Sequence, residues 1–217
     1  MGGGLHAATL TLYEFTPGNI FGPTNPNPAV VVSSIDQSVG DFDVSGTSGT
    51  AFLRASSSEA NLAAALANPD YIQFTLSPAT GQVISLESFI FDHEASNNTA
   101  SAFTSNISIF ASVTGFAVPP SAGDELGTST VAIGANLGTA PLLQIDDVTF
   151  SLAAPQFQGL TSANTVTFRV YGFDDASLTD QIGRADDVRV IGSVVPEPSS
   201  LALLLGGIGM LARRRRR

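Results

Sequence analysis

Residues 72–76 read Ile72-Gln73-Phe74-Thr75-Leu76, so every second side chain is apolar. A period of two is the pattern of a β-strand with one face in a core and the other face in water. The same alternation recurs at 107–109, 148–152 and 166–170. These stretches predict half-buried antiparallel strands.

Further short strands are expected where apolar residues are bounded by Gly, Pro, Asn or Asp, at 9–15, 30–35, 42–44, 83–91 and 187–191. Only 58–67 has a helical pattern, with Pro69 after its end. Nine or ten strands of this length close most readily as two packed sheets. The predicted fold class is therefore all-β, a two-sheet antiparallel β-sandwich of jelly-roll type, in a chain of 217 residues that suits one main domain.

Charge is distributed unevenly along the chain. There is no Lys, and five of the nine arginines are the last five residues. Residues 1–195 hold four arginines against eighteen acidic residues, a formal charge of −14. Because binding to nucleic acid depends on basic side chains that neutralise phosphates, this body is not expected to bind nucleic acid.

The residue inventory also argues against catalysis. Cysteine is absent, which excludes disulfides, thiolate nucleophiles and Cys-ligated metals. A serine hydrolase needs a base, and only His6 and His93 exist, without a nucleophile elbow of the G-x-S-x-G kind. We interpret His93 as part of a solvated loop after a strand, with a metal or catalytic role as the alternative. The protein is predicted not to be an enzyme.

The C-terminus combines three signals. Pro196-Glu197-Pro198 precedes a twelve-residue apolar run, 201–212, and then the arginine block. As a helix the run would be about 18 Å long, which is short of a bilayer, but cationic side chains reach the headgroups and remain on the cytoplasmic side. We therefore predict a C-terminal hydrophobic helix with the acidic body on the outside.

This order of signals resembles the sorting tail of PEP-CTERM proteins, the exported substrates of exosortases in Gram-negative bacteria. The resemblance covers about a tenth of the chain. It implies export, transient retention in the inner membrane, and processing near the tripeptide by an exosortase-type enzyme. The alternative is a generic tail anchor. The resemblance assigns the sorting motif to Pro196, Glu197 and Pro198, the membrane helix to Leu201, Leu203, Leu204, Leu205, Ile208 and Leu211, and the basic stop to Arg213, Arg214, Arg215, Arg216 and Arg217.

The body has a weaker family resemblance. The stretches 70–78, 86–92, 166–172 and 186–190 resemble the jelly-roll ectodomains common in PEP-CTERM proteins. The last of them also resembles the closing strand of carbohydrate-binding modules. This resemblance implies fold far more than ligand, because sandwich folds host unrelated functions.

Acidic residues could act as the paired carboxylates of a glycosidase or hold a cation. Candidates for the first role are the adjacent pairs Asp146-Asp147, Asp174-Asp175 and Asp186-Asp187, but adjacent acids on a regular strand point to opposite faces and cannot flank one bond. Asp186 is in phase with Val188 and Val190, and Glu14 with the apolar row of the first strand. In carbohydrate-binding modules that resemble this closing strand, a structural calcium ion often links the first and last strands. We therefore expect Glu14 and Asp186 to share a calcium ion, with ordinary strand-end residues as the alternative.

The N-terminus supplies the last boundary. Leu5-His6-Ala7-Ala8 has the small-residue ending of a signal cleavage site, although no charged or long apolar region precedes it. We interpret 1–8 as the remnant of a signal peptide, 9–192 as the ectodomain and 193–217 as the sorting tail. The predicted function is an exported, non-catalytic protein of the cell surface or extracellular matrix, with exopolysaccharide as a candidate partner. Alternatives are a carbohydrate-binding module or a polysaccharide-acting enzyme.

Overall fold

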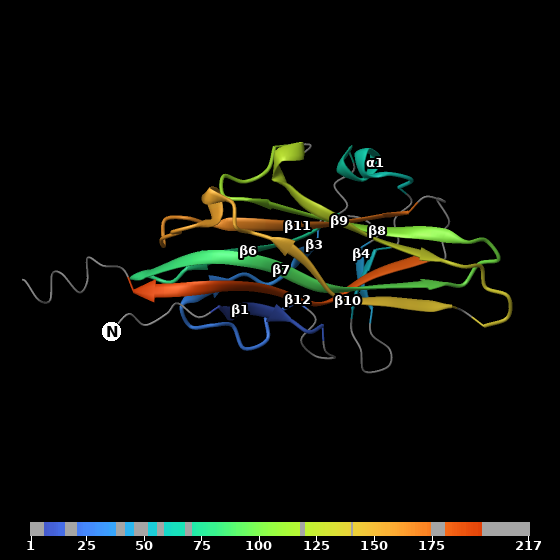
Figure 1. The fold of residues 1–217 in the computed structure, drawn as a ribbon, viewed down its shortest axis with the longest axis horizontal. Helices are drawn as coiled ribbons and strands as arrows, with labels where there is room; N and C mark the ends of the chain where they lie inside the picture. Colours follow the sequence, from blue (N-terminus) through green and yellow to red (C-terminus); the bar gives the residue numbers. More distant parts are fainter. Residues whose placement is uncertain are drawn as a thin grey trace, which may run out of the picture.

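The fold is a sandwich of two antiparallel sheets (Figure 1). The computed structural model describes residues 7–15, 21–37, 42–45, 52–55, 59–67, 71–117, 120–139, 141–174 and 181–196. Within these residues each sheet has six strands. The predicted fold class is thus confirmed as far as the two sheets, whereas the predicted helix at 201–212 lies outside the described residues.

The first sheet has the strand order β10-β7-β12-β5-β4, and β1 pairs with β12 on the same side as β5, further along the strand. The second sheet has the order β2-β6-β11-β8-β9, and β3 pairs with β6. The strands of the first sheet are β1 (Ala8–Tyr13), β4 (Phe42–Ser45), β5 (Phe52–Ala55), β7 (Gln82–Asn97), β10 (Leu142–Ser151) and β12 (Gln181–Pro196). Those of the second are β2 (Val30–Val32), β3 (Asp36–Gln37), β6 (Ile72–Pro78), β8 (Phe103–Ser112), β9 (Glu125–Ile133) and β11 (Val166–Asp174).

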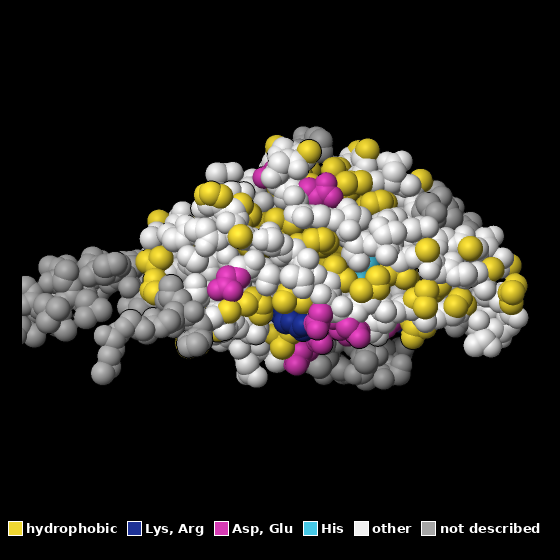
Figure 2. All heavy atoms as spheres, in the orientation of Figure 1, with side chains coloured by type: hydrophobic (Ala, Val, Ile, Leu, Met, Phe, Trp, Pro, Cys, Tyr) yellow, Lys and Arg dark blue, Asp and Glu magenta, His cyan; other side chains and the backbone are white. Residues whose placement is uncertain are grey.

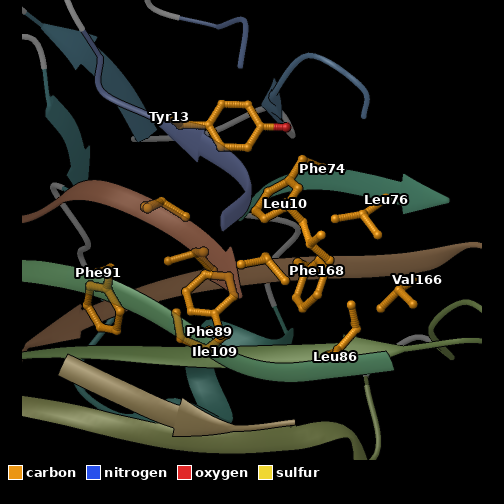
Figure 3. Close-up of a cluster of buried hydrophobic side chains, with 14 of the residues drawn as sticks. Leu10, Tyr13, Phe74, Leu76, Leu86, Phe89, Phe91, Ile109, Val166 and Phe168 are labelled. Carbon is orange, nitrogen blue, oxygen red and sulfur yellow. The ribbon is translucent and has the colours of Figure 1, made fainter. Parts of the chain in front are cut away.

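The core lies between the two sheets and is built from the apolar rows of the alternating strands. Phe89 of β7 meets Phe74 of β6 at 6.2 Å and Phe168 of β11 at 5.5 Å between ring centroids. All three rings are fully buried, and Figure 3 shows them within one cluster. Each large buried aromatic side chain contributes on the order of 2 kcal/mol by leaving water, so this cluster is a main source of stability.

A helix covers part of the outer face of the second sheet. α1 (Leu62–Ala67) falls within the predicted helical stretch and packs Ala65 against Tyr171 and Phe110. Arg169 lies over the rings of Tyr71 and Phe116, at 4.0 and 4.6 Å from their centroids. The acidic residues of β7, β10 and β12 lie on the first sheet, away from this small second core.

Candidate functional site

The sorting motif begins inside the last strand of the fold. Pro196 is the final residue of β12 and is paired in register with Gln82 of β7. Residues 197–217, with the predicted membrane helix and arginine block, lie outside the described part of the chain. Among the described residues no helix has the length and apolarity needed to cross a membrane. Because Pro196 belongs both to β12 and to the tripeptide, no spacer separates the motif from the first sheet.

Two bulges bring acidic residues together on the same sheet. On β10 the register shifts between Ile145 and Val148, so that Asp146 and Asp147 both oppose Asp92 of β7. On β12 it shifts between Asp186 and Arg189, directly after Asp186 pairs with Asp92. In both bulges the second aspartate has a left-handed backbone, with φ of 54° at Asp147 and 48° at Asp187. Aspartate tolerates this conformation better than most residues.

The bulges overturn an expectation about the acid pairs. Adjacent acids point to opposite faces only while a strand stays regular, and the extra residue of a bulge breaks that alternation. Asp186 and Asp187 both interact electrostatically with Asp92. The backbone N–H of Asp147 donates to Oδ1 of Asp92 at 2.8 Å. We name Asp92, Asp147, Asp186 and Asp187 the acidic bulge cluster.

Burial and like charges together perturb this cluster. Burial raises the pKa of Asp186 to about 6, with further contributions from Asp187, Asp92 and Glu94, while the Asp187 backbone N–H opposes the shift. The pKa of Asp187 is also raised, by burial and by Asp92, with Arg189 opposing. Directly opposed like charges destabilise a strand pair, so the carboxylates of this cluster repel one another and destabilise the sheet at neutral pH.

Two arginines on β12 offset part of this charge. Arg184 forms an ion pair with Glu94 of β7, and Arg189 forms one with Asp147 of β10. Both arginines are half-buried. Because each arginine joins β12 to a different strand, the ion pairs connect β12 with β7 and β10, the three strands that carry the acidic bulge cluster.

Glu14 and Asp186, which were predicted to share a calcium ion, are not directly opposite each other on β1 and β12. β1 pairs antiparallel with β12, as the terminal strands were expected to meet, and Tyr13 is opposite Val188. Glu14 is therefore next to Asp187, with which it interacts, rather than next to Asp186. Asp186 is also not in phase with the buried Val188, because the bulge puts Ala185 in the core instead. Among the described residues, no group of three or more His, Cys, Asp or Glu side chains is placed to hold a metal ion. The calcium site stays a prediction.

The interpretation of His93 as a loop residue was wrong. β7 continues through Asn97, and His93 is fully buried between the sheets. Its Nδ1 is 2.9 Å from Oγ of Ser129 on β9, and its Nε2 is 3.0 Å from Oγ of Ser105 on β8. Burial lowers its pKa to about 4, so it is neutral at pH 7. As expected for a strand, Asp92 and Glu94 lie on the face opposite His93, and the three do not converge.

Comparison with known proteins gives a family match for the C-terminal segment. The family model described as PEP-CTERM protein-sorting motif matches residues 194–217. The chain carries a PEP-CTERM protein-sorting motif. The motif implies export and processing by an exosortase, with transient C-terminal membrane anchoring before that step. The matched segment includes the end of β12, so the PEP-CTERM motif and the sandwich share a strand.

Similar solved structures are β-sandwich-like. The K3 cleaved adhesin domain of Lys-gingipain from Porphyromonas gingivalis has 14% identity and a TM-score of 0.40, covering 86% of this chain and 99% of that one. A carbohydrate-binding module specific for non-crystalline cellulose, CBM28, has 12% identity and a TM-score of 0.36, covering 72% and 86%. Similarity at this level carries no argument about ligands. No curated protein sequence matches this chain.

Proposed function

We propose that this protein is an exported, non-catalytic component of the cell surface or extracellular matrix, sorted through Pro196-Glu197-Pro198. The observation that carries the proposal is the PEP-CTERM motif over 194–217. Its position supports the proposal, because a folded sandwich that ends at the tripeptide would stay outside the membrane while the tail is processed. The arginine block at 213–217 is suited to hold the tail at the cytoplasmic side.

The lack of catalysis is supported by the placement of the groups that could act. His93 has no exposed surface, so it cannot reach a substrate. Glu94 and Asp147 are held in ion pairs with arginines. A glycosidase needs two carboxyl groups on either side of a bond, and the acidic bulge cluster instead lies along one sheet.

A carbohydrate-binding role is the less favoured alternative. Such modules hold sugars against exposed aromatic rings. Among the residues whose side-chain exposure the structure describes, the only aromatic side chain that is clearly exposed is Phe21, at 39%. The guanidinium group of Arg169 covers one face of Tyr71 and one of Phe116. Binding of the purified protein to a glycan array would revive this alternative.

The sorting proposal is tested by replacing Pro196, Glu197 and Pro198 with alanine in the full chain, expressed in a host with an exosortase. The wild type should lose its C-terminal segment and leave the membrane fraction, whereas the triple variant should keep the segment and stay there. Replacing Ser199 and Ser200 with alanine is the matched control and should behave as the wild type. Identical fractionation and identical C-terminal masses for the triple variant and the wild type would overturn the proposal.

A further inference from the structure

One end of the sandwich is built from chain that carries no charge. Residues 95–123 and 126–145 contain no acidic, basic or histidine side chain, although the whole chain has a net charge of −10. These residues form β8, most of β9, and β10 as far as Ile145. Figure 2 shows hydrophobic side chains gathered at the right-hand end of the molecule, where these strands lie in Figure 1.

The first four residues of β10 form an exposed apolar strand at the edge of the first sheet. Within the described residues β10 pairs only with β7, so its other side is open. Leu142, Leu143 and Ile145 are 56%, 45% and 43% exposed, and Gln144 between them is also exposed. Open strand edges of this composition pair readily with another strand.

Two neighbouring stretches of strand edge, on the rest of β10 and on β9, are protected in ways that this segment is not. After Ile145, β10 carries the charged bulge of Asp146 and Asp147, which bends the strand and repels a partner. β9, at the edge of the second sheet, exposes Thr128, Thr130 and Ala132 rather than large apolar side chains. On β10 the unprotected stretch is therefore Leu142–Ile145, which we name the apolar edge.

The backbone of the apolar edge is oriented for pairing. The backbone N–H of Asn97 in β7 donates to the carbonyl of Pro141 at 3.2 Å. Since hydrogen-bonding groups alternate along an antiparallel strand, Leu143 directs its N–H and C=O toward β7. Leu142 and Gln144 then direct theirs outward, where an added strand would meet them.

We propose that the apolar edge pairs antiparallel with the same segment of a second copy of this chain. A second copy can pair here although two bodies of −14 repel each other wherever their acidic surfaces meet, because the same uncharged edge, with its outward N–H and C=O groups, is complementary to itself in an antiparallel pair. At the apolar edge neither copy presents a charge. Centred on Leu143, the pairing sets Leu143 opposite its copy and Leu142 opposite Gln144 on both sides.

This register also keeps the nearest acids apart. The two Asp146 residues are then six positions apart along the paired strands, or about 20 Å, which exceeds the Debye length of about 8 Å at physiological ionic strength. The arrangement is a closed twofold dimer, because each copy uses the same edge and leaves none open there. It joins the two first sheets into one continuous sheet.

The absence of cysteine makes the register directly testable. A centred, non-hydrogen-bonded pair has its Cα atoms about 4.5 Å apart, which is within disulfide range. In the full chain in detergent, Leu143→Cys should therefore form a disulfide dimer under mild oxidation at least tenfold faster than Val31→Cys. Val31 is the matched control, because it is 63% exposed on β2, at an edge of the other sheet.

Sedimentation of cysteine-free variants supplies the second measurement. The wild type and Val31→Lys should sediment as dimers, and Leu143→Lys, which sets two like charges face to face, as a monomer with an unchanged circular dichroism spectrum. Gln144→Pro removes an outward N–H without adding charge and should also be monomeric. If Leu143→Cys cross-links no faster than Val31→Cys, or if Leu143→Lys and Gln144→Pro associate as the wild type does, the proposed dimer is wrong.

Discussion

His93 is the residue whose chemistry the fold changes most. Burial lowers its pKa from 6.5 to about 4. The unfolded chain therefore binds a proton before the folded one as the pH falls, and stability is lost between pH 6.5 and 4. By linkage, the titration of His93 alone should lower the free energy of unfolding by about 2 kcal/mol between pH 7 and pH 5.

Asp186 acts in the opposite direction over nearly the same range. Its pKa is raised from 3.8 to about 6, so the folded chain binds the proton first and stability is gained as the pH falls through 6. Because the side chain is only half-buried, we expect a gain of about 1 kcal/mol. The two titrations should partly cancel in the wild type between pH 7 and pH 5.

Single substitutions should separate the two effects in urea unfolding measured at pH 7 and pH 5. Asp186→Asn should be more stable than the wild type at pH 7 and should lose more stability on acidification. His93→Gln, which keeps hydrogen-bonding groups, should lose less stability than the wild type on acidification, or should gain stability. His6→Gln is the control for removing a histidine and should follow the wild type. Parallel curves for all four proteins would contradict the assigned titrations.

The same Asp186→Asn protein tests the calcium prediction. If Glu14 and Asp186 share an ion, calcium at a hundredfold excess over Kd should add about 2.7 kcal/mol to the stability of the wild type. Chelator should then lower its melting temperature, and Asp186→Asn should respond little to either. A wild-type melting curve that is the same in calcium and in chelator would show that no such site exists.

At the scale of elements, β12 depends on close approach to its neighbours. A Cβ atom at Gly192 would lie 2.6 Å from the backbone oxygen of Ser85 on β7 and 2.8 Å from Cδ1 of Leu10 on β1. Gly192→Ala should therefore force the strands apart and lower the unfolding free energy by about 1–3 kcal/mol.

Urea unfolding measures this effect, with Gly134→Ala as the matched control, because a Cβ atom there meets nothing within 4 Å. Equal stability of the two variants would show that β7 and β1 yield to the added methyl group without cost.

Strands with strict alternation could be predicted from sequence, and those that break it could not. β6 and β11 follow directly from their apolar rows. The far half of β7 was missed because its buried row is His93, Ala95 and Asn97, which reads as polar loop. β9 was missed because Gly127, Thr128 and Ser129 interrupt its apolar pattern.

The acidic bulge cluster could not be predicted because a bulge changes which face a residue occupies without a clear signal in the pattern. The one available signal is the repeated sequence Asp-Asp-Val, at 146–148 and 186–188, inside two strands. Aspartate is rare within strands, so its double occurrence there indicates an irregular backbone. The charged partners of each pair depend on the strand order, which local sequence does not specify.

At the scale of the whole molecule, the sorting tail could be predicted from the sequence, but the position in the sandwich of the strand that carries it could not. The tail could be predicted because its signals are contiguous: a tripeptide, an apolar run and an arginine block. The strand that precedes it lies inside the first sheet, with β7 on one side and β1 and β5 on the other. That placement arises from pairings between residues more than eighty positions apart in the sequence.

The position of β12 has a mechanical consequence. While the tail holds the protein at a membrane, as proposed, any drag on the exposed sandwich is transmitted along β12. An edge strand pulled away sideways would lose its hydrogen bonds one after another. An interior strand pulled along its axis must break many of them at once, from Pro196 back through the pairs with β7. The tether is thus attached to a strand whose hydrogen bonds with β7 are loaded in shear when it is pulled along its axis.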